Sequence, residues 1–243
     1  MKTLVREENR ILESGKNPRR DFIRKGIIAG AITSVAGINL ITSCKKSNEE
    51  DISPSEDLMR EHGLLNRILL IYDTCKSNLM NKIPFQLDAL NNSAQIIRTF
   101  IEEYHEKLEE NFLFPRFEKA NKLTSLVEVL RSQHKAGRTI TDQIIQISSM
   151  ENLSEEDSEQ LIKLLNDFNV MYRPHEARED TILFPALREI ITESEYFALG
   201  EDFEDKEHEL FGEDGFEKEV EKVATLEKQL GIYELSIFTP DLT

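Results

Sequence analysis

Residues 105–115 of this chain read HEKLEENFLFP, and residues 175–185 read HEAREDTILFP. The two segments align without a gap as His-Glu-x-x-Glu-acid-x-apolar-Leu-Phe-Pro. On a helix, side chains four residues apart lie on one face with Cβ atoms about 5–6 Å apart. Each segment therefore presents an imidazole beside a carboxylate, and two such pairs facing one another would hold two metal ions. The pairs are His105 with Glu109 and His175 with Glu179.

The composition of the chain favours helices. Its 243 residues include only 10 Gly and 7 Pro and no Trp, whereas Leu, Ile, Glu and Lys are abundant. No Asn-Gly or Asp-Gly turn separates two alternating apolar runs, so there is no hairpin signal. We therefore expect an all-α protein.

Apolar residues at helical spacing predict four long helices, at about residues 55–81, 87–114, 124–149 and from Ser154 through the second copy of the motif. Asp157 forms an approximate capping box with Ser154. We expect the second helix to end near Pro115 and the fourth to kink just before His175, at Pro174. Short connections predict an up-down-up-down four-helix bundle over residues 55–196.

Two further histidines, His62 and His134, lie on the apolar stripes of the first and third helices. A single histidine at such a position is more often a satisfied core residue than a metal ligand. A charged glutamate on a core-facing stripe, however, costs several kcal/mol unless it is paired or coordinated. The combination predicts a metal site made of His62, His105, Glu109, His134, His175 and Glu179. Four imidazoles and two carboxylates suit iron or manganese, and an oxide or hydroxide bridge or an anionic ligand would balance the charge.

This order of motifs resembles the hemerythrin-like, HHE cation-binding family over about residues 55–190. The resemblance implies a non-haem di-iron centre in which the four histidines are terminal ligands and Glu109 and Glu179 form bridges. It implies binding of oxygen or a related small ligand for sensing, scavenging or storage. The alternative is a di-iron oxidoreductase acting on nitric oxide or peroxide, or an iron-donating repair protein.

The sequence departs from the oxygen-carrying members of this family at one position. Those members have a second histidine four residues after the third-helix ligand, where this chain has Arg138. A less complete coordination sphere favours a reactive centre over stable, reversible oxygen carriage. Asp180 stands where the family uses an aspartate and competes with Glu179 as the bridge; the internal repeat favours Glu179.

Several other residues near the motifs have more than one interpretation. Glu106 and Glu176 lie about 100° from the ligand face, so we expect them to support the ligands or lie at the surface. Tyr172 fits ordinary packing better than proton transfer. Gly137 leaves room for a ligand or for close helix packing, and Cys75 is expected to be a small buried apolar residue.

The first 44 residues form a basic leader. They hold eight of the 30 Lys and Arg but only four of the 46 Asp and Glu. Arg19-Arg20 precede an uncharged run over residues 26–43, which resembles a twin-arginine export signal; the alternative is a transmembrane anchor. Cys44 ends a lipoprotein-like box, and residues 45–54 suit a flexible tether. We therefore expect an exported, periplasmic or cell-envelope protein, tethered to the membrane by a lipid on Cys44.

The remainder of the chain is strongly acidic, which excludes a nucleic-acid-binding surface. Residues 197–243 are expected to form a C-terminal helical extension. His208 in this extension should lie at the surface or support the ligands from outside. The final residues should pack Tyr233, Ile237 and Phe238 against the bundle.

Overall fold

The computed structural model describes residues 53–240, and these residues are helical with no strand among them. The leader, Cys44 and nearly all of the expected tether lie outside the described residues. The all-α prediction is confirmed for the part that the structure describes. Its elements are α3 (Pro54–Met80), α4 (Leu87–Ile96), η1 (Ile97–His105), α5 (Glu106–Leu108), η2 (Glu109–Leu113), α6 (Phe114–Lys119), α7 (Thr124–Ser148), α8 (Glu155–Arg178), η3 (Glu179–Leu183), α9 (Phe184–Leu187), α10 (Glu193–Phe211), α11 (Gly215–Leu230) and the short 3₁₀ helix η4 (Leu235–Phe238).

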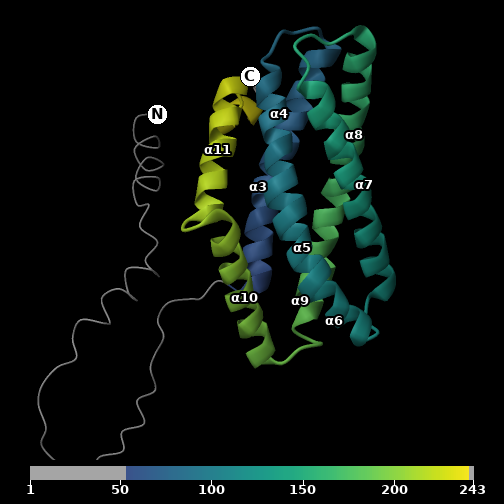
Figure 1. Cartoon of the computed structure of the whole chain (residues 1–243), viewed down its shortest axis with the longest axis vertical. Helices are drawn as coiled ribbons and strands as arrows, with labels where there is room; N and C mark the ends of the chain where they lie inside the picture. The colour runs from purple at the N-terminus through teal and green to yellow at the C-terminus, as the bar shows by residue number, and fades with distance from the viewer. Residues whose placement is uncertain (1–52, 241–243) are drawn as a thin grey trace, which may run out of the picture. The chain divides into compact units, whose positions relative to one another are not determined.

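Four long helical segments surround a common core. α3 packs against α8 and η1, and α7 packs against α8 and α4. Successive segments run in opposite directions (Figure 1). This arrangement is compatible with the expected up-down-up-down four-helix bundle.

Local sequence fixes where two of these segments begin. The Ser53 hydroxyl accepts a hydrogen bond from the Glu56 amide at 3.3 Å, so Ser53 is the N-cap of α3. The capping box predicted at α8 is confirmed: the Ser154 hydroxyl accepts from the Asp157 amide at 3.1 Å, and the Asp157 carboxylate accepts from the Ser154 amide at 2.9 Å. Both caps satisfy amide groups that have no partner within the helix.

The prediction that the second helix ends at Pro115 is wrong. The segment stays helical to Lys119, because a π-helical turn, η2, immediately precedes α6 and places Pro115 in the first turn of a new helix. Proline is tolerated there because its missing N–H would have no partner. The second copy of the motif repeats this device with η3 and Pro185, and α8 runs through Pro174 to Arg178.

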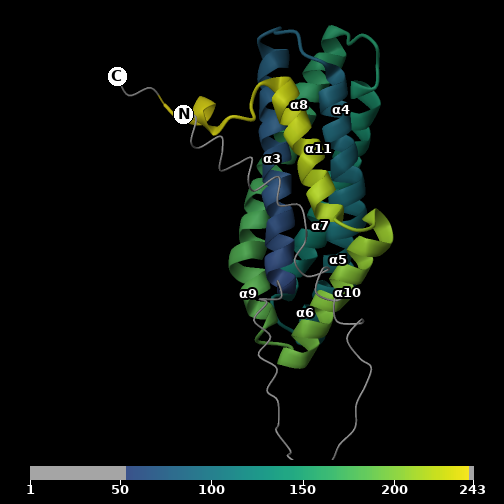
Figure 2. The ribbon, with the colours of Figure 1, turned by 90° about the vertical axis from the view of Figure 1, so that its left-hand side faces the viewer.

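The C-terminal helices α10 and α11 pack along the side of α3 (Figure 2). α10 begins at Glu193, behind a second capping box made by Thr192 and Glu195, so the expected boundary at residue 196 falls inside this helix. The buried Phe203 ring contacts Phe112, with centroids 5.7 Å apart. α10 therefore covers the helix that carries His105.

The predicted packing of the C-terminal tail is wrong. Ile237 is 51% exposed and Phe238 is 49% exposed, while Tyr233 is partly buried under the ammonium group of Lys228. The short 3₁₀ helix η4 turns these apolar side chains outward, away from the core.

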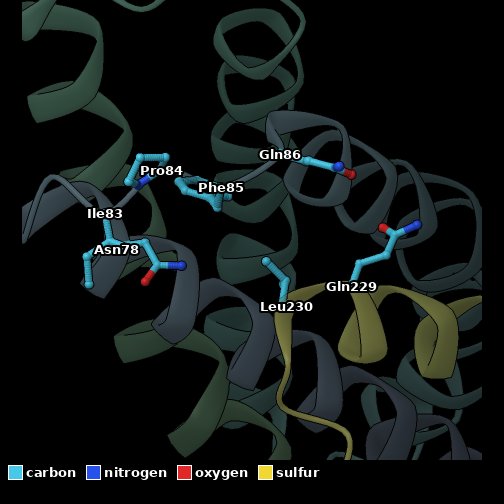
Figure 3. A pocket seen from close by; sticks show the side chains of 7 residues that line it. All are labelled: Asn78, Ile83, Pro84, Phe85, Gln86, Gln229 and Leu230. Carbon is cyan, nitrogen blue, oxygen red and sulfur yellow. The ribbon is translucent and has the colours of Figure 1, made fainter.

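The core itself is apolar, and Cys75 is fully buried in it, as predicted. A surface pocket of about 470 Å³ lies where the end of α3 and the start of α4 meet the end of α11, lined by Ile83, Phe85, Leu230 and their neighbours (Figure 3). Asn78 of this pocket is 16 residues from His62 along α3, about 24 Å, so the pocket is separate from the histidine cluster. None of the helices over residues 53–240 combines the length and the apolar character that a membrane span requires.

Candidate metal centre

The four predicted histidines meet inside the protein as two pairs. The Nε2 atoms of His62 and His105 are 3.1 Å apart, and those of His134 and His175 are 3.2 Å apart. All four side chains are buried. Each pair joins a lone histidine of one helix to a motif histidine of its neighbour, so four helical segments contribute one ring each.

Glu109 lies between the two histidine pairs. One of its carboxylate oxygens is 3.7 Å from His105 Nε2 and 3.5 Å from His134 Nε2. The side chain is fully buried, and neither oxygen has a donor in hydrogen-bond geometry among the described residues. Burial, together with the negative charge of Glu179, raises the pKa of Glu109 well above its usual value. A bound cation would remove this cost.

Glu179 takes the equivalent place from the other side. Its carboxylate oxygen is 3.1 Å from His175 Nε2 and 3.5 Å from His62 Nε2. Asp180, the competing candidate, instead contacts the outer nitrogen of His62, with 2.7 Å between its oxygen and Nδ1. The geometry therefore places Glu179, and not Asp180, in the position that corresponds to Glu109.

Two of the imidazoles, those of His105 and His134, are held neutral, which is the state that binds metal. Burial, reinforced by the neighbouring His62, lowers the pKa of His105 well below its usual value. Burial also lowers the pKa of His134 to about 4, although the Glu110 carboxylate opposes this shift. A neutral ring keeps a lone pair on one nitrogen and a hydrogen on the other.

The outer nitrogen of every ring has an oxygen partner. A carboxylate or amide oxygen accepts a hydrogen bond from Nδ1, so the hydrogen belongs on Nδ1 and the lone pair of Nε2 points into the cluster. The four contacts are His62 with Asp180 at 2.7 Å, His105 with Glu61 at 2.6 Å, His134 with Glu110 at 3.2 Å and His175 with Gln133 at 2.9 Å.

The Leu-Phe-Pro end of each motif forms an apolar wall of the cluster. Phe184 stacks on His62 with centroids 5.5 Å apart, and Phe114 stacks on His134 at the same distance. Each phenylalanine follows the π-helical turn that begins at the motif glutamate. A π-helical turn holds one residue more than an α-helical turn, and such turns are frequent at functional sites.

Arg138, which stands where a further histidine would be, is engaged outside the cluster. Its guanidinium donates to Glu106 and to Glu110, each at 2.6 Å. Glu106 also accepts from the Tyr172 hydroxyl at 2.6 Å, and in the other half Glu176 accepts from the Asn66 amide. Glu106 and Glu176 are therefore buried supporting groups and not surface residues.

Gly137 makes room for a side chain and not for a ligand. A Cβ atom at this position would lie 2.1 Å from the Tyr172 hydroxyl oxygen. The absence of a side chain at Gly137 thus lets Tyr172 reach Glu106. His208, in contrast, is exposed on α10 and lies outside the cluster.

Three partners of the histidine rings were not found from the sequence: Glu61, Glu110 and Gln133. Each lies directly beside a predicted ligand in the sequence, and that adjacency is the signal that could have revealed them. A neighbouring residue points about 100° away on its own helix. Such a residue contacts an imidazole only because a histidine of another helix lies beside it, and that proximity depends on how the helices pack.

The cluster fits two metal ions. Two ligand nitrogens at about 2.1 Å from one ion and at right angles to each other lie about 3 Å apart. The two Nε2 separations, 3.1 and 3.2 Å, match this value. Glu109 and Glu179 each have an oxygen within reach of both pairs, as bridging carboxylates require.

Comparison with known proteins agrees with this geometry. The family described as "Hemerythrin HHE cation binding domain" matches residues 53–187. Uncharacterized proteins from Mycobacterium bovis and from Mycobacterium tuberculosis are each 45% identical to this chain over 222 residues, covering 85% of the chain and 87% of the relative. The aligned 85% of the chain is a larger share than residues 1–187 represent. The similarity to these relatives therefore extends beyond the end of the family match and into α10. No solved structure matches the chain.

The matched region is more than half of the chain and contains all four helical segments with their histidines and glutamates. The buried His and Glu cluster fits a metal site of the kind that the family name describes. The chain therefore belongs to the hemerythrin HHE cation-binding domain family.

Proposed function

We propose that this protein is a four-helix-bundle di-iron protein that binds oxygen or a related small ligand for sensing, scavenging or storage. The observation that carries the proposal is the arrangement of the four imidazoles. The Nε2 atoms of His62 and His105 are 3.1 Å apart and those of His134 and His175 are 3.2 Å apart, and the buried Glu109 and Glu179 each lie between these two histidine pairs. Iron, once bound, would supply reversible ligand binding and one-electron chemistry.

The residues of the chain would perform three tasks in this function. His62, His105, His134 and His175 would hold the ions, with Glu109 and Glu179 shared between them. The Nδ1 partners fix the orientation of the rings. Phe114 and Phe184, stacked on two of the rings, exclude water from the cluster and limit access to small molecules.

Iron is preferred to zinc because the cluster offers four imidazoles and two shared carboxylates and no thiolate. Cys75 is buried elsewhere in the core. Manganese is the second choice for the same set of donors.

A second function, an oxidoreductase acting on nitric oxide or peroxide, is favoured by one specific observation. The Tyr172 hydroxyl donates to Glu106, and Glu106 accepts from the partly exposed Arg138. This hydrogen-bonded chain connects a ring packed beside His175 to the edge of the protein. The buried Glu106 carboxyl, whose pKa is raised to about 8, can hold a proton in this chain, and the Arg138 guanidinium stays protonated and anchors it. Reduction of these substrates consumes protons. The same centre could alternatively donate iron for repair.

The leader supports a proposal about location. Arg19-Arg20 and the uncharged run that follows them suit a twin-arginine export signal, and Cys44 suits lipid attachment at the mature N-terminus. Mass spectrometry of the mature protein from a membrane fraction would test this. An unprocessed N-terminus would contradict the export proposal.

The function is tested by metal content and by an absorption spectrum. We expect close to two iron ions per chain after anaerobic reconstitution, and a charge-transfer band that develops with oxygen and is lost when oxygen is removed. Repeated consumption of peroxide or nitric oxide would favour the enzymatic alternative. Less than one ion per chain after reconstitution would refute both.

Substitutions test the ligand set. His105→Ala and Glu179→Ala should each lower metal occupancy, because each removes a donor that faces the cluster. His208→Ala, which changes an exposed histidine on α10, should leave occupancy unchanged. If Asp180→Ala removes metal while Glu179→Ala does not, the bridging assignment is wrong.

A further inference from the structure

The two halves of the cluster are related by the sequence repeat, but their surroundings differ in charge. The residue before each lone histidine contacts the outer nitrogen of the partner ring. In one half this residue is Glu61, 2.6 Å from His105 Nδ1; in the other it is Gln133, 2.9 Å from His175 Nδ1. A carboxylate and a neutral amide thus occupy equivalent places.

The residue after each motif glutamate shows a second difference. Asp180 contacts His62, and among residues 53–240 no Lys or Arg lies within ion-pair distance of it. Glu110 contacts His134, but it also pairs with Arg138 at 2.6 Å and with Lys107 at 2.5 Å. The negative charge beside His134 is therefore largely offset.

The residue four positions after each lone histidine shows a third difference. The neutral side-chain amide of Asn66, after His62, donates a hydrogen bond to Glu176. The cationic guanidinium of Arg138, after His134, donates a hydrogen bond to Glu106 at 2.6 Å. All three differences act in the same direction: the half with His62 and His105 is the more negative.

These differences affect the affinity for a cation. A carboxylate on the outer nitrogen of a ligand histidine makes the ring a stronger donor, and loss of such a partner typically costs 10–100-fold in metal affinity. The effect of a nearby charge is largest at a buried site, where the effective dielectric constant is low. Glu61 is almost fully buried, and a cation bound by His62 and His105 favours its ionised form, whereas Arg138 brings a positive charge to the opposite half.

We propose that His62 and His105 form the tighter of two metal sites, and that the ion held by His134 and His175 is the one more readily lost. This inference rests on the proposed two-ion centre and deepens it. At limiting metal, the protein would hold one ion beside Glu61 and leave the half beside Gln133 free to exchange.

The test measures each half separately. A first ion repels a second, so two unequal constants in the wild-type protein would not by themselves identify the halves. Metal-free, full-length His134→Ala and His62→Ala proteins should therefore be titrated with Mn²⁺ against a chromophoric chelator. We expect His134→Ala to bind one ion about 10–100-fold more tightly than His62→Ala does.

Exchanging the two partner residues provides the matched test. Glu61→Gln, added to His134→Ala, should weaken binding by about 10–100-fold, and Gln133→Glu, added to His62→Ala, should strengthen it. As the control, Gln146→Glu in the His62→Ala protein adds the same charge at an exposed position on α7, and it should leave the Mn²⁺ dissociation constant unchanged. Circular dichroism would verify that the compared variants keep wild-type helicity.

The outcomes separate the inference from the proposed function. Equal constants for the two half-site variants, a reversed order, or partner exchanges that change nothing would overturn the assignment while leaving a two-ion centre intact. If the wild-type protein binds no Mn²⁺ and no Fe²⁺, the proposed function fails and the assignment fails with it.

Discussion

Gly137 and Tyr172 form a contact in which a missing side chain has a structural role. The Tyr172 hydroxyl occupies the space where a Cβ of residue 137 would lie, and from there it donates to Glu106. Mid-helix glycine costs about 1 kcal/mol relative to alanine, and at this position the cost is offset by a buried hydrogen bond.

Gly137→Ala should therefore destabilise the protein by about 1–3 kcal/mol, because overpacking forces side chains off their rotamers. The free energy of unfolding in urea measures this change. Gly63→Ala is the matched control, since a Cβ there meets nothing within 4 Å, and it should stabilise by up to about 1 kcal/mol. Equal effects at the two glycines would contradict the proposed contact.

The thiol of Cys75 should be unreactive in the folded protein. Burial raises its pKa to about 12, so almost no thiolate exists near pH 8, and the reactive form of cysteine is the thiolate. A Cys44→Ser variant leaves Cys75 as the remaining thiol of the chain. With a disulfide reagent this variant should react slowly when native and rapidly in denaturant; rapid native reaction would contradict the burial.

At the scale of elements, the π-helical turns show how one motif performs two tasks. η2 and η3 each begin at a motif glutamate and end just before a phenylalanine and a proline. The turn places the glutamate in the cluster and the phenylalanine against a histidine ring of another helix, and it starts a new helix in which the proline is tolerated.

α10 is held to the body by its buried aromatic residues, and this can be measured. Phe203 is fully buried whereas Phe197, on the same helix, is 54% exposed. Phe203→Ala should cost about 3–5 kcal/mol through lost burial and a cavity, and Phe197→Ala should change stability by less than about 0.5 kcal/mol. Denaturant unfolding followed by circular dichroism compares the two. A small effect at Phe203 would mean that α10 is not part of the cooperative core.

At the scale of the whole molecule, the metal-free protein carries buried carboxyls that resist ionisation. Burial, with Glu207 nearby, raises the pKa of Glu61 to about 8. Burial also raises the pKa of Glu106 to about 8 and that of Glu176 to about 9. In the unfolded chain all three would ionise near pH 4.5, so the folded state binds more protons between pH 4.5 and 9.

The free energy of unfolding of the metal-free protein should therefore fall as the pH rises from about 7.5 to 9. In this window the lowered pKa values of His105 and His134 add no slope, because both rings are neutral in the folded and unfolded states. Urea unfolding in the presence of a chelator measures the trend. Bound metal should flatten it, since a cation favours the ionised carboxylates, and a rise in stability over the same window would contradict the burial of these groups.

Bound metal should also raise stability directly. An ion that binds only the folded state adds about 2.7 kcal/mol at a free concentration 100 times its dissociation constant. Thermal unfolding of wild-type protein with increasing Mn²⁺ should show a rising midpoint temperature. His105→Ala should show a smaller rise at the same concentrations, whereas His208→Ala should behave like the wild type.

Much of this protein could be read from its sequence because the information is local and repeated. Helical periodicity gave the four long segments, the Ser154 cap was visible in four residues, and two copies of one motif identified the glutamates that meet in the cluster. Each of these signals depends on spacing within a single helix, which the backbone geometry alone determines.

Tertiary packing decided the rest. Only the neighbouring helices place Glu179 between two imidazoles, turn Asp180 to the outer nitrogen of His62, and bring Glu61 and Gln133 to equivalent rings. The sequence predicted a symmetric pair of metal-binding motifs. The structure shows unequal surroundings, because the charge around each ring is supplied by residues from other helices, and their positions depend on how the helices pack.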